Sequence, residues 1–201
     1  MRLGNPSATP GPGSHLSEDE RELVSRVRRG DTAAFEHIFM VYYNRLCLFA
    51  ETYVISAQIA EELVDDVFCS IWERRAEWDV RHGLKAYLYG SVRNRALKNL
   101  ARDRVAGQVR DEAEREERAL AMGQPAVGAD DLVAAGELGE AVTRALSALP
   151  PRCRQTYLLH RQHQLSYAEI AATMGISTKT VENHLARALK ALRMSLADWL
   201  S

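Results

Sequence analysis

The sequence predicts an all-α protein with two helical domains joined by a flexible linker, the second domain containing a helix-turn-helix. Apolar residues recur every three or four positions through most of the 201-residue chain, and no segment shows the apolar–polar alternation of a strand. Two stretches without an apolar stripe divide the chain. We therefore expect a disordered tail at residues 1–16, a first domain at 17–105, an acidic linker at 106–136 and a second domain at 137–201.

The first domain is expected to contain four helices. Residues 17–20 form a capping-box pattern that begins a short helix ending at Gly30. Asp31 then caps a long helix with one apolar stripe, and Ser56 caps a third. The fourth helix is expected to run from Gly83 to Asp103. Its apolar positions lie on one side and its basic residues on the other.

The second domain has the local pattern of a helix-turn-helix. A helix begins near Glu137, and Pro150-Pro151 end it and start the next one. The capping box of residues 166–169 opens a short helix, which Gly175 ends, and Ser177 caps a longer final helix. A short capped helix, a tight turn and a longer helix are typical of a helix-turn-helix.

The first turns of the final helix carry side chains suited to the edges of base pairs. In a major groove, Arg and Lys pair with guanine, Asn pairs with adenine and Glu accepts from cytosine, each good pair discriminating by about 1–3 kcal/mol. The free backbone N–H groups at the start of the helix also favour a phosphate. The alternative is a plain helical hairpin with a polar face. The residues expected to read duplex DNA are Ser177, Thr178, Lys179, Thr180, Glu182, Asn183 and Arg187.

The fourth helix combines basic residues with aromatic ones. Tyr87 and Tyr89 lie among the charges, and Trp78 precedes them. Basic side chains hold a phosphate backbone, while an unpaired base can stack on a tyrosine at about 1–3 kcal/mol. This combination favours single-stranded or melting DNA, and the alternative is a solvated basic face with tyrosines in the core. The residues expected to contact this DNA are Lys85, Tyr89, Arg93, Asn94, Arg95, Lys98 and Arg102.

Charge is strongly segregated along a chain whose net charge is only −1. Residues 61–79 carry seven acids and two bases, and residues 81–104 carry seven bases and one acid. Residues 106–140 carry nine acids and three bases, and residues 141–201 carry eight bases and three acids. Such blocks indicate two nucleic-acid contacts and a further partner of positive character, unless they are patchy surface charge without function.

The acidic block is concentrated on the third helix. Neighbouring turns of this helix carry four acidic residues, Glu61, Glu62, Asp65 and Asp66. Like charges so placed destabilise a helix by about 0.3 kcal/mol per pair. Paired carboxylates can be catalytic, but no nucleophile–base set, phosphate loop or metal cluster accompanies them. A protein surface with positive character is the favoured target, and we expect no enzyme activity and no cofactor.

These residues together resemble a bacterial RNA polymerase sigma factor of the extracytoplasmic-function (ECF) group. Residues 60–75 (AEELVDDVFCSIWERR) are similar to the helix of that family that binds the polymerase clamp, and residues 84–97 (LKAYLYGSVRNRAL) to its promoter-melting helix. Residues 149–154, 165–171 and 180–185 are similar to its reader of the upstream promoter element. The three motifs occur in the order of the family.

The resemblance implies partners and roles. Core RNA polymerase would bind at Glu62, Asp65, Asp66, Cys69 and Trp72. The basic helix would grip the non-template strand of the minus-ten element of promoter DNA and extrude a base, the final helix would read the minus-thirty-five element, and the acidic linker would thread toward the RNA exit path. The family often has an anti-sigma partner, so an anti-sigma factor is expected here too.

A stand-alone helix-turn-helix regulator is the alternative, because residues 177–185 also resemble the DNA-binding domain of quorum-sensing-type regulators. The front half is expected to be all helical, which does not favour such a regulator. The net charge of −1 does not favour DNA binding without a partner. Cys153, His160 and His163 have no standard zinc spacing, so no metal site is expected. The longest apolar run has six residues, so we expect no membrane insertion and a cytoplasmic location.

Overall fold

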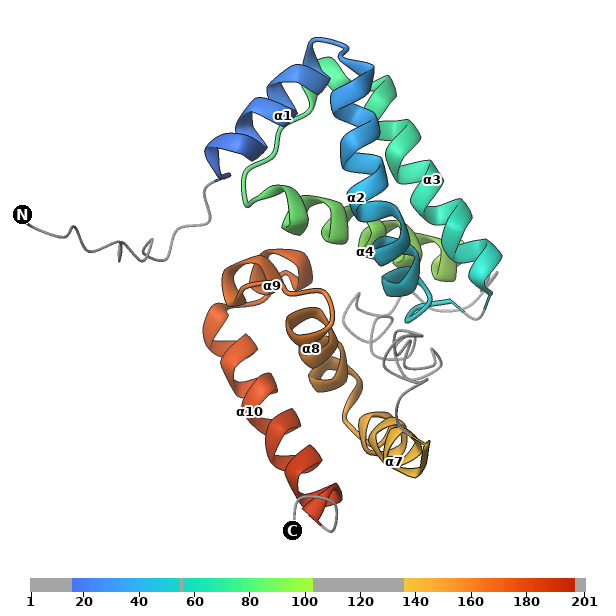
Figure 1. Ribbon diagram of the computed structural model, residues 1–201, viewed down its shortest axis with the longest axis vertical. Coiled ribbons are helices and arrows are strands. Elements are labelled where there is room, and N and C mark those ends of the chain that lie inside the picture. Colours follow the sequence, from blue (N-terminus) through green and yellow to red (C-terminus); the bar gives the residue numbers. More distant parts are fainter. Residues whose placement is uncertain (1–15, 55, 103–135, 198–201) are drawn as a thin grey trace, which may run out of the picture.

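The computed structural model describes residues 16–54, 56–102 and 136–197, and this part of the chain is helical throughout (Figure 1). The front half consists of α1 (Glu18–Arg28), α2 (Thr32–Ala50), α3 (Ala57–Glu73), the short 3-10 helix η1 (Arg75–Glu77) and α4 (Leu84–Arg102). The back half consists of α7 (Gly136–Ser147), α8 (Pro151–Arg161), α9 (Tyr167–Met174) and α10 (Thr178–Ser195). The all-α fold class is thus confirmed. The expected tail (1–16) lies outside the described residues except for Leu16. The expected acidic linker (106–136) lies outside them except for Gly136.

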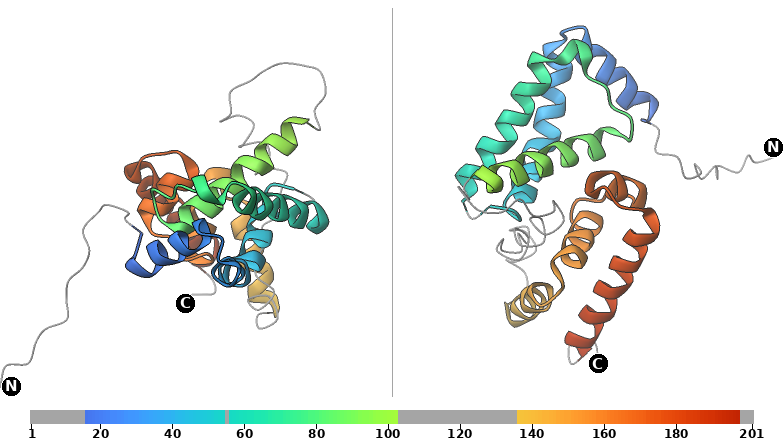
Figure 2. Two further views of the ribbon diagram at one scale, coloured as in Figure 1. Left: turned by 90° about the horizontal axis from the view of Figure 1, so that it is seen from above. Right: turned by 180° about the vertical axis from the view of Figure 1, so that it is seen from behind.

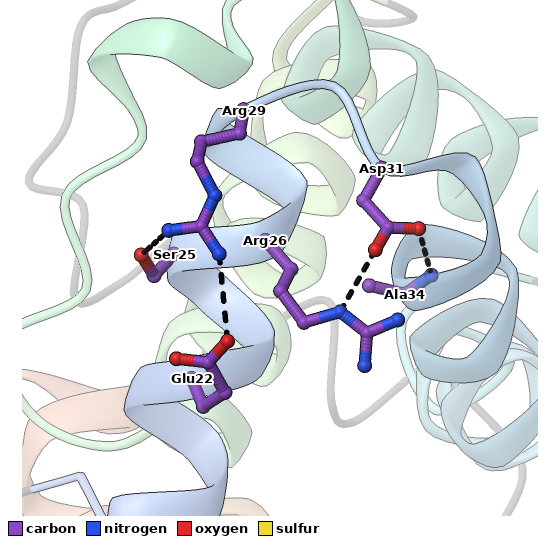
Figure 3. Close-up of polar contacts among 6 residues, drawn as sticks. All are labelled: Glu22, Ser25, Arg26, Arg29, Asp31 and Ala34. Atoms are coloured by element: carbon purple, nitrogen blue, oxygen red, sulfur yellow. Dashed lines mark hydrogen bonds and ion pairs between the residues drawn. The ribbon is translucent and has the colours of Figure 1, made fainter.

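Short-range polar contacts set the helix boundaries of the front half (Figure 3). The side chain of Ser17 accepts from the backbone N–H of Glu20, and the Glu20 carboxylate accepts from the backbone N–H of Ser17, which completes the expected capping box. Asp31 caps α2 by accepting from the N–H of Ala34 at 3.1 Å, and its other oxygen accepts from Nε of Arg26 at 2.8 Å. Asp31 therefore ties the end of α1 to the start of α2.

The α1–α2 corner lowers the pKa of the Asp31 carboxyl below its ordinary value, first through the hydrogen bond from Ala34 and then through Arg26. This contribution to stability is present above the ordinary pKa and is lost as the pH falls through the lowered one. Ser56 stands at the N-cap of α3 as expected, but its side chain makes no capping hydrogen bond, so the start of α3 depends on packing.

The two halves share one hydrophobic core. In Figures 1 and 2, α4 crosses the ends of α2 and α3, and α9 lies against its other side. Leu88 and Val92 of α4 belong to the same buried cluster as Ile170 and Met174 of α9. A second, smaller cluster joins α7, α8 and α10 around Leu146 and Leu192. The sequence predicts two helical units but not this packing of one on the other.

Candidate nucleic-acid interface

The helix-turn-helix of α9 and α10 forms as the sequence predicts. The side chain of Ser166 accepts from the N–H of Glu169, and the chain turns at Gly175 with φ 66° and ψ 36°, a left-handed conformation that favours glycine. Ser177 then caps α10 by accepting from the N–H of Thr180 at 3.1 Å. Val181 and Leu185 anchor the inner face of α10, which turns the opposite face outward.

The outward face of α10 carries the expected reading residues. Lys179, Glu182 and Asn183 are exposed, and Thr180 is half-buried. Glu182 accepts from Nζ of Lys179 at 2.9 Å, so its carboxylate is paired with a cation one turn back. The amide of Asn183 and the guanidinium of Arg187 are exposed on the same face. Side chains of these two types are suited to the edges of base pairs. The exposed set consists of Ser177, Thr178, Lys179, Glu182, Asn183 and Arg187.

A histidine that sequence reasoning missed lies behind the reading face. Nδ1 of His184 is 3.5 Å from Sγ of Cys153, which joins α10 to α8. Burial lowers the pKa of His184, and the nearby guanidinium groups of Arg152 and Arg187 lower it further. The imidazole is therefore neutral at physiological pH, and Cys153 contributes to packing.

Two connected surface pockets border the exposed side of α4. The first, of about 210 Å³, lies between α3 and α4, with Val67 and Ile71 among its apolar lining and Ser91, Asn94, Arg95 and Lys98 among its polar lining. The second, also about 210 Å³, lies at η1 and the loop after it and is lined by Arg74, Glu77, Trp78 and Asp79 among others. Ser70, Ile71 and Tyr87 line both. We refer to the two pockets together as the α3–α4 groove.

The groove brings together Asn94, Arg95 and Lys98 of the expected minus-ten set. It also adds Ser70 and Ser91, which sequence reasoning missed because single serines in helices carry no periodic signal. Lys85 is half-buried on another part of α4, where its Nζ donates to the carbonyl of Gln164 at 3.4 Å. Arg102 is the last residue of α4, and its side chain lies outside the described part of the chain.

The stacking role expected of Tyr89 does not fit this structure. Tyr89 is 1% exposed and packs edge-on against Phe49, with ring centroids 5.0 Å apart. Trp78 is 4% exposed and packs edge-on against Tyr87. A base cannot reach the ring of Tyr89, whereas Tyr87 is half-buried and lines the groove, as Trp78 also does. Arg93 is 9% exposed, so its guanidinium is largely withdrawn from solvent too, with Nη1 donating to Oδ1 of Asn94.

The acidic face of α3 is exposed beside the groove. Glu62, Asp65, Asp66 and Cys69 are all accessible, and Trp72 is half-buried. The ring of Trp72 packs on Phe35, with centroids 5.0 Å apart, and the guanidinium of Arg75 lies 4.6 Å from its centroid. Asp66 accepts from Nη2 of Arg95 at 2.7 Å, which fastens α3 to α4. One ion pair thus joins the acidic face to the basic side of the groove.

Comparison with known proteins identifies the family. The family model "Sigma-70 region 2" matches residues 38–105, and the model "Sigma-70, region 4" matches residues 139–192. The ECF RNA polymerase sigma-E factor of Escherichia coli strain K12 is 26% identical over 182 residues, covering 86% of this chain and 92% of that protein. The sigma factor SigW of Bacillus subtilis is 22% identical over 181 residues, covering 89% and 97%.

Solved structures show the same fold. A structure of CnrH in complex with the cytosolic domain of CnrY has a TM-score of 0.59 and 23% identity, covering 90% of this chain and 98% of CnrH. The sigma factor RpoE, in complex with the anti-sigma factor NepR from Bartonella quintana, has a TM-score of 0.54 and 20% identity, covering 81% and 96%. This chain belongs to the sigma-70 family of RNA polymerase sigma factors, in the ECF group.

Sigma factors in general are not enzymes. Within the described residues, no group of three or more His, Cys, Asp or Glu could hold a metal ion. In the same part of the chain, no helix combines the length and the apolar character that crossing a membrane requires.

Proposed function

We propose that this sigma factor binds core RNA polymerase through the acidic face of α3, holds the non-template strand of the minus-ten element in the α3–α4 groove, and reads the minus-thirty-five element with α10. The front half would thereby start promoter melting, and the back half would select the upstream sequence. Because its partners are polymerase and promoter DNA, we place the protein in the cytoplasm. The complex of the sigma factor RpoE with the anti-sigma factor NepR also supports an anti-sigma partner for this chain.

The α3–α4 groove is the observation that carries this proposal. Its apolar lining, from Val67 and Ile71, suits the face of an extruded base, and its serine and asparagine side chains can bond to base edges. Arg95 and Lys98 line the same hollow, where a phosphate backbone would pass. An aromatic ring, an apolar surface and two cations in one groove fit single-stranded DNA better than a duplex, which offers no free base face.

The ion pair between Asp66 and Arg95 supports a link between the two interfaces. Asp66 belongs to the proposed polymerase face, and Arg95 lines the proposed DNA groove. When a phosphate approaches Arg95, it competes with the Asp66 carboxylate for the same guanidinium. The carboxylate that is released can then turn to a cation on the polymerase. Binding of one partner would in this way favour binding of the other.

Run-off transcription tests the proposed function most directly. Purified chain is mixed with core polymerase and a template carrying candidate promoters, and the transcripts are measured. A defined run-off product that depends on this chain supports sigma activity, because a stand-alone regulator cannot direct core polymerase by itself. Absence of product on templates drawn from the native genome, under conditions where a reference sigma factor initiates, would reject it.

Removing a carboxylate from α3 should weaken polymerase binding. Asp65→Ala and Glu62→Ala each remove an exposed charge from the proposed face, and a lost contact of about 1 kcal/mol weakens binding about fivefold. The affinity for core polymerase is measured by fluorescence anisotropy. Glu36→Ala, which removes an exposed carboxylate from α2, is the control and should bind normally. Equal affinity of all three variants would remove α3 from the polymerase interface.

Replacing the side chain of Asn183 should reduce the base selectivity of the protein at the minus-thirty-five element. Asn183→Ala should cut discrimination at one position of the minus-thirty-five element by about 5- to 150-fold, the equivalent of 1–3 kcal/mol. Run-off products from a template library randomised in that element, sequenced after one round, give the base preference. Arg193→Ala, in the last turn of α10, removes a charge without a reading role and should leave the preference intact. An unaltered base preference for Asn183→Ala would show that Asn183 does not read the minus-thirty-five element.

A further inference from the structure

Two half-buried residues border the acidic face of α3 without belonging to it. Arg75 lies in η1, just after α3, and Tyr43 lies in α2, which packs along α3 (Figure 1). Arg75 contacts the indole of Trp72. Tyr43 contacts the carboxylate of Asp65. Both of the side chains that are contacted in this way are proposed to bind polymerase.

The guanidinium of Arg75 is bound to Trp72 in two ways. Its central carbon lies 4.6 Å from the centroid of the indole ring, which is a cation–π distance, and Nη1 donates to the backbone carbonyl of Trp72 at 2.7 Å. The same indole packs on Phe35 of α2, with centroids 5.0 Å apart. A ring that contacts both a guanidinium and a second ring has few other rotamers open to it. The indole of Trp72 is therefore held in one orientation.

The corner between α1 and α2 fixes the position of Arg75. A Cβ at Gly30 would lie 3.7 Å from Nε of Arg75, so the guanidinium lies beside the backbone of this corner. Gly30 has a φ of 87°, which is a left-handed conformation that favours glycine. The next residue is Asp31, whose bonds to Arg26 and Ala34 fix the corner (Figure 3). The orientation of the indole thus depends on a corner that α1 and α2 form together.

Tyr43 supports Asp65 from α2. The ring of Tyr43 stacks on Phe39, with centroids 4.5 Å apart, and lies 6.5 Å from the ring of Phe68 in α3. Asp65 precedes Phe68 by three residues, so the two side chains are neighbours on α3. The hydroxyl of Tyr43 donates to the Asp65 carboxylate. Burial first, and then the Cys47 thiol and this carboxylate, raise the pKa of the phenol to about 12, so the hydroxyl keeps the proton that it donates.

Neither contact uses up the side chain that it holds. A carboxylate has about four lone-pair sites, so Asp65 can accept from Tyr43 and still accept from a lysine or an arginine of polymerase. Asp65 is exposed, and Trp72 is half-buried, so part of its indole remains accessible. Both side chains can therefore bind polymerase while they stay in contact with the residues that hold them.

A side chain that is fixed before binding increases affinity. Ordering a mobile side chain at an interface weakens binding by about two- to tenfold, and a side chain that is already ordered in the free protein avoids this loss. Tryptophan is among the residues that contribute most at the centre of interfaces. The order that is imposed on the indole and on the carboxylate therefore has a direct value for affinity.

We propose that Arg75 and Tyr43 are positioning residues of the polymerase interface. Arg75 holds the indole of Trp72 in the orientation that polymerase binds, and Tyr43 does the same for the carboxylate of Asp65. This role rests on the proposed function, because polymerase is the partner that requires the geometry. The order of the side chains is a property of the free chain and can be measured without polymerase.

The direction of a change in affinity separates positioning from an effect of charge. The favoured partner of the acidic face is positive, so a cation at the edge of this face repels it. If charge alone mattered, Arg75→Gln would tighten binding, whereas the loss of positioning weakens it. Tyr43→Phe likewise removes a donor that partly neutralises the Asp65 carboxylate. A positioning role therefore predicts weaker binding where electrostatics alone predicts equal or tighter binding.

Fluorine NMR of the free chain tests the order of the indole. The chain contains three tryptophans, which are labelled as 5-fluorotryptophan, and Trp72→Phe identifies the Trp72 resonance. In Arg75→Gln this resonance should shift toward its position in the urea-unfolded chain, because the indole becomes mobile. Arg28→Gln, which replaces an exposed arginine at the end of α1, is the control and should not shift it. An unchanged Trp72 resonance in Arg75→Gln would overturn the positioning role of Arg75.

Affinity for core polymerase, measured by fluorescence anisotropy, tests the purpose of the order. Arg75→Gln should bind about two- to tenfold more weakly than the wild type. In a Trp72→Leu background, the same substitution should change the affinity by less than about twofold, since no indole remains to be positioned. An effect of equal size in both backgrounds would overturn the proposal, because Arg75 would then act independently of Trp72.

Tyr43→Phe should also weaken binding by about two- to tenfold, and this effect should disappear in an Asp65→Ala background. Tyr42→Phe removes the hydroxyl of the neighbouring half-buried tyrosine, so it is the matched control and should bind like the wild type. Tighter binding by Tyr43→Phe or by Arg75→Gln would overturn positioning and show that charge decides.

Thermal melting followed by circular dichroism shows whether each variant folds. If Arg75→Gln does not fold, Arg75→Lys takes its place, because lysine keeps the charge but lacks the planar guanidinium and should weaken binding as well. Wild-type protein that fails to bind core polymerase would count against the proposed function, and the fluorine resonance would still decide whether Arg75 orders the indole. Wild-type affinity in folded Arg75 and Tyr43 variants would reject the positioning roles and leave polymerase binding by this chain unaffected.

Discussion

The packing of α4 between two sets of helices is the constraint on which the rest of the structure depends. α2 and α3 cover one part of its surface and α9 covers another, so Leu88 and Tyr89 serve a core that both halves share. A side chain that is committed to this core is lost to DNA. On the side proposed to bind DNA, Asn94 and Lys98 are exposed in the strip that borders the α3–α4 groove. The position of the groove is therefore a consequence of which faces of α4 are already occupied.

Ion pairs on both basic surfaces restrain the affinity of the free chain for DNA. Asp66 neutralises Arg95 beside the groove, and Glu182 neutralises Lys179 on the reading face of α10. Non-specific DNA affinity depends on the number of free cations that meet phosphates, so each internal pair reduces it. Together with a net charge of −1, these pairs are consistent with the proposal that promoter binding requires polymerase.

Local signals in the sequence predicted local structure well. The capping boxes at Ser17 and Ser166 and the left-handed turn at Gly175 form as expected, because each depends on residues within one turn of helix. The stacking role expected of Tyr89 fails for a different reason. Helical periodicity shows that a residue lies on a given face, but not that a distant segment will cover that face. The partner of Tyr89 is 74 positions away along the chain, and no pattern near either residue signals the contact.

The geometry of α4 explains why two of its tyrosines differ in accessibility. Tyr87 and Tyr89 are two residues apart, which at 3.6 residues per turn is about 200° around the helix, so they point to opposite sides. Tyr87 lines the groove, and Tyr89 lies in the core that α4 shares with α9, where its hydroxyl is 2.9 Å from Nδ1 of His163. Asn183 and Arg187 are exposed in the same structure. The packing of α4 on α9 therefore leaves both the groove and the outward face of α10 accessible.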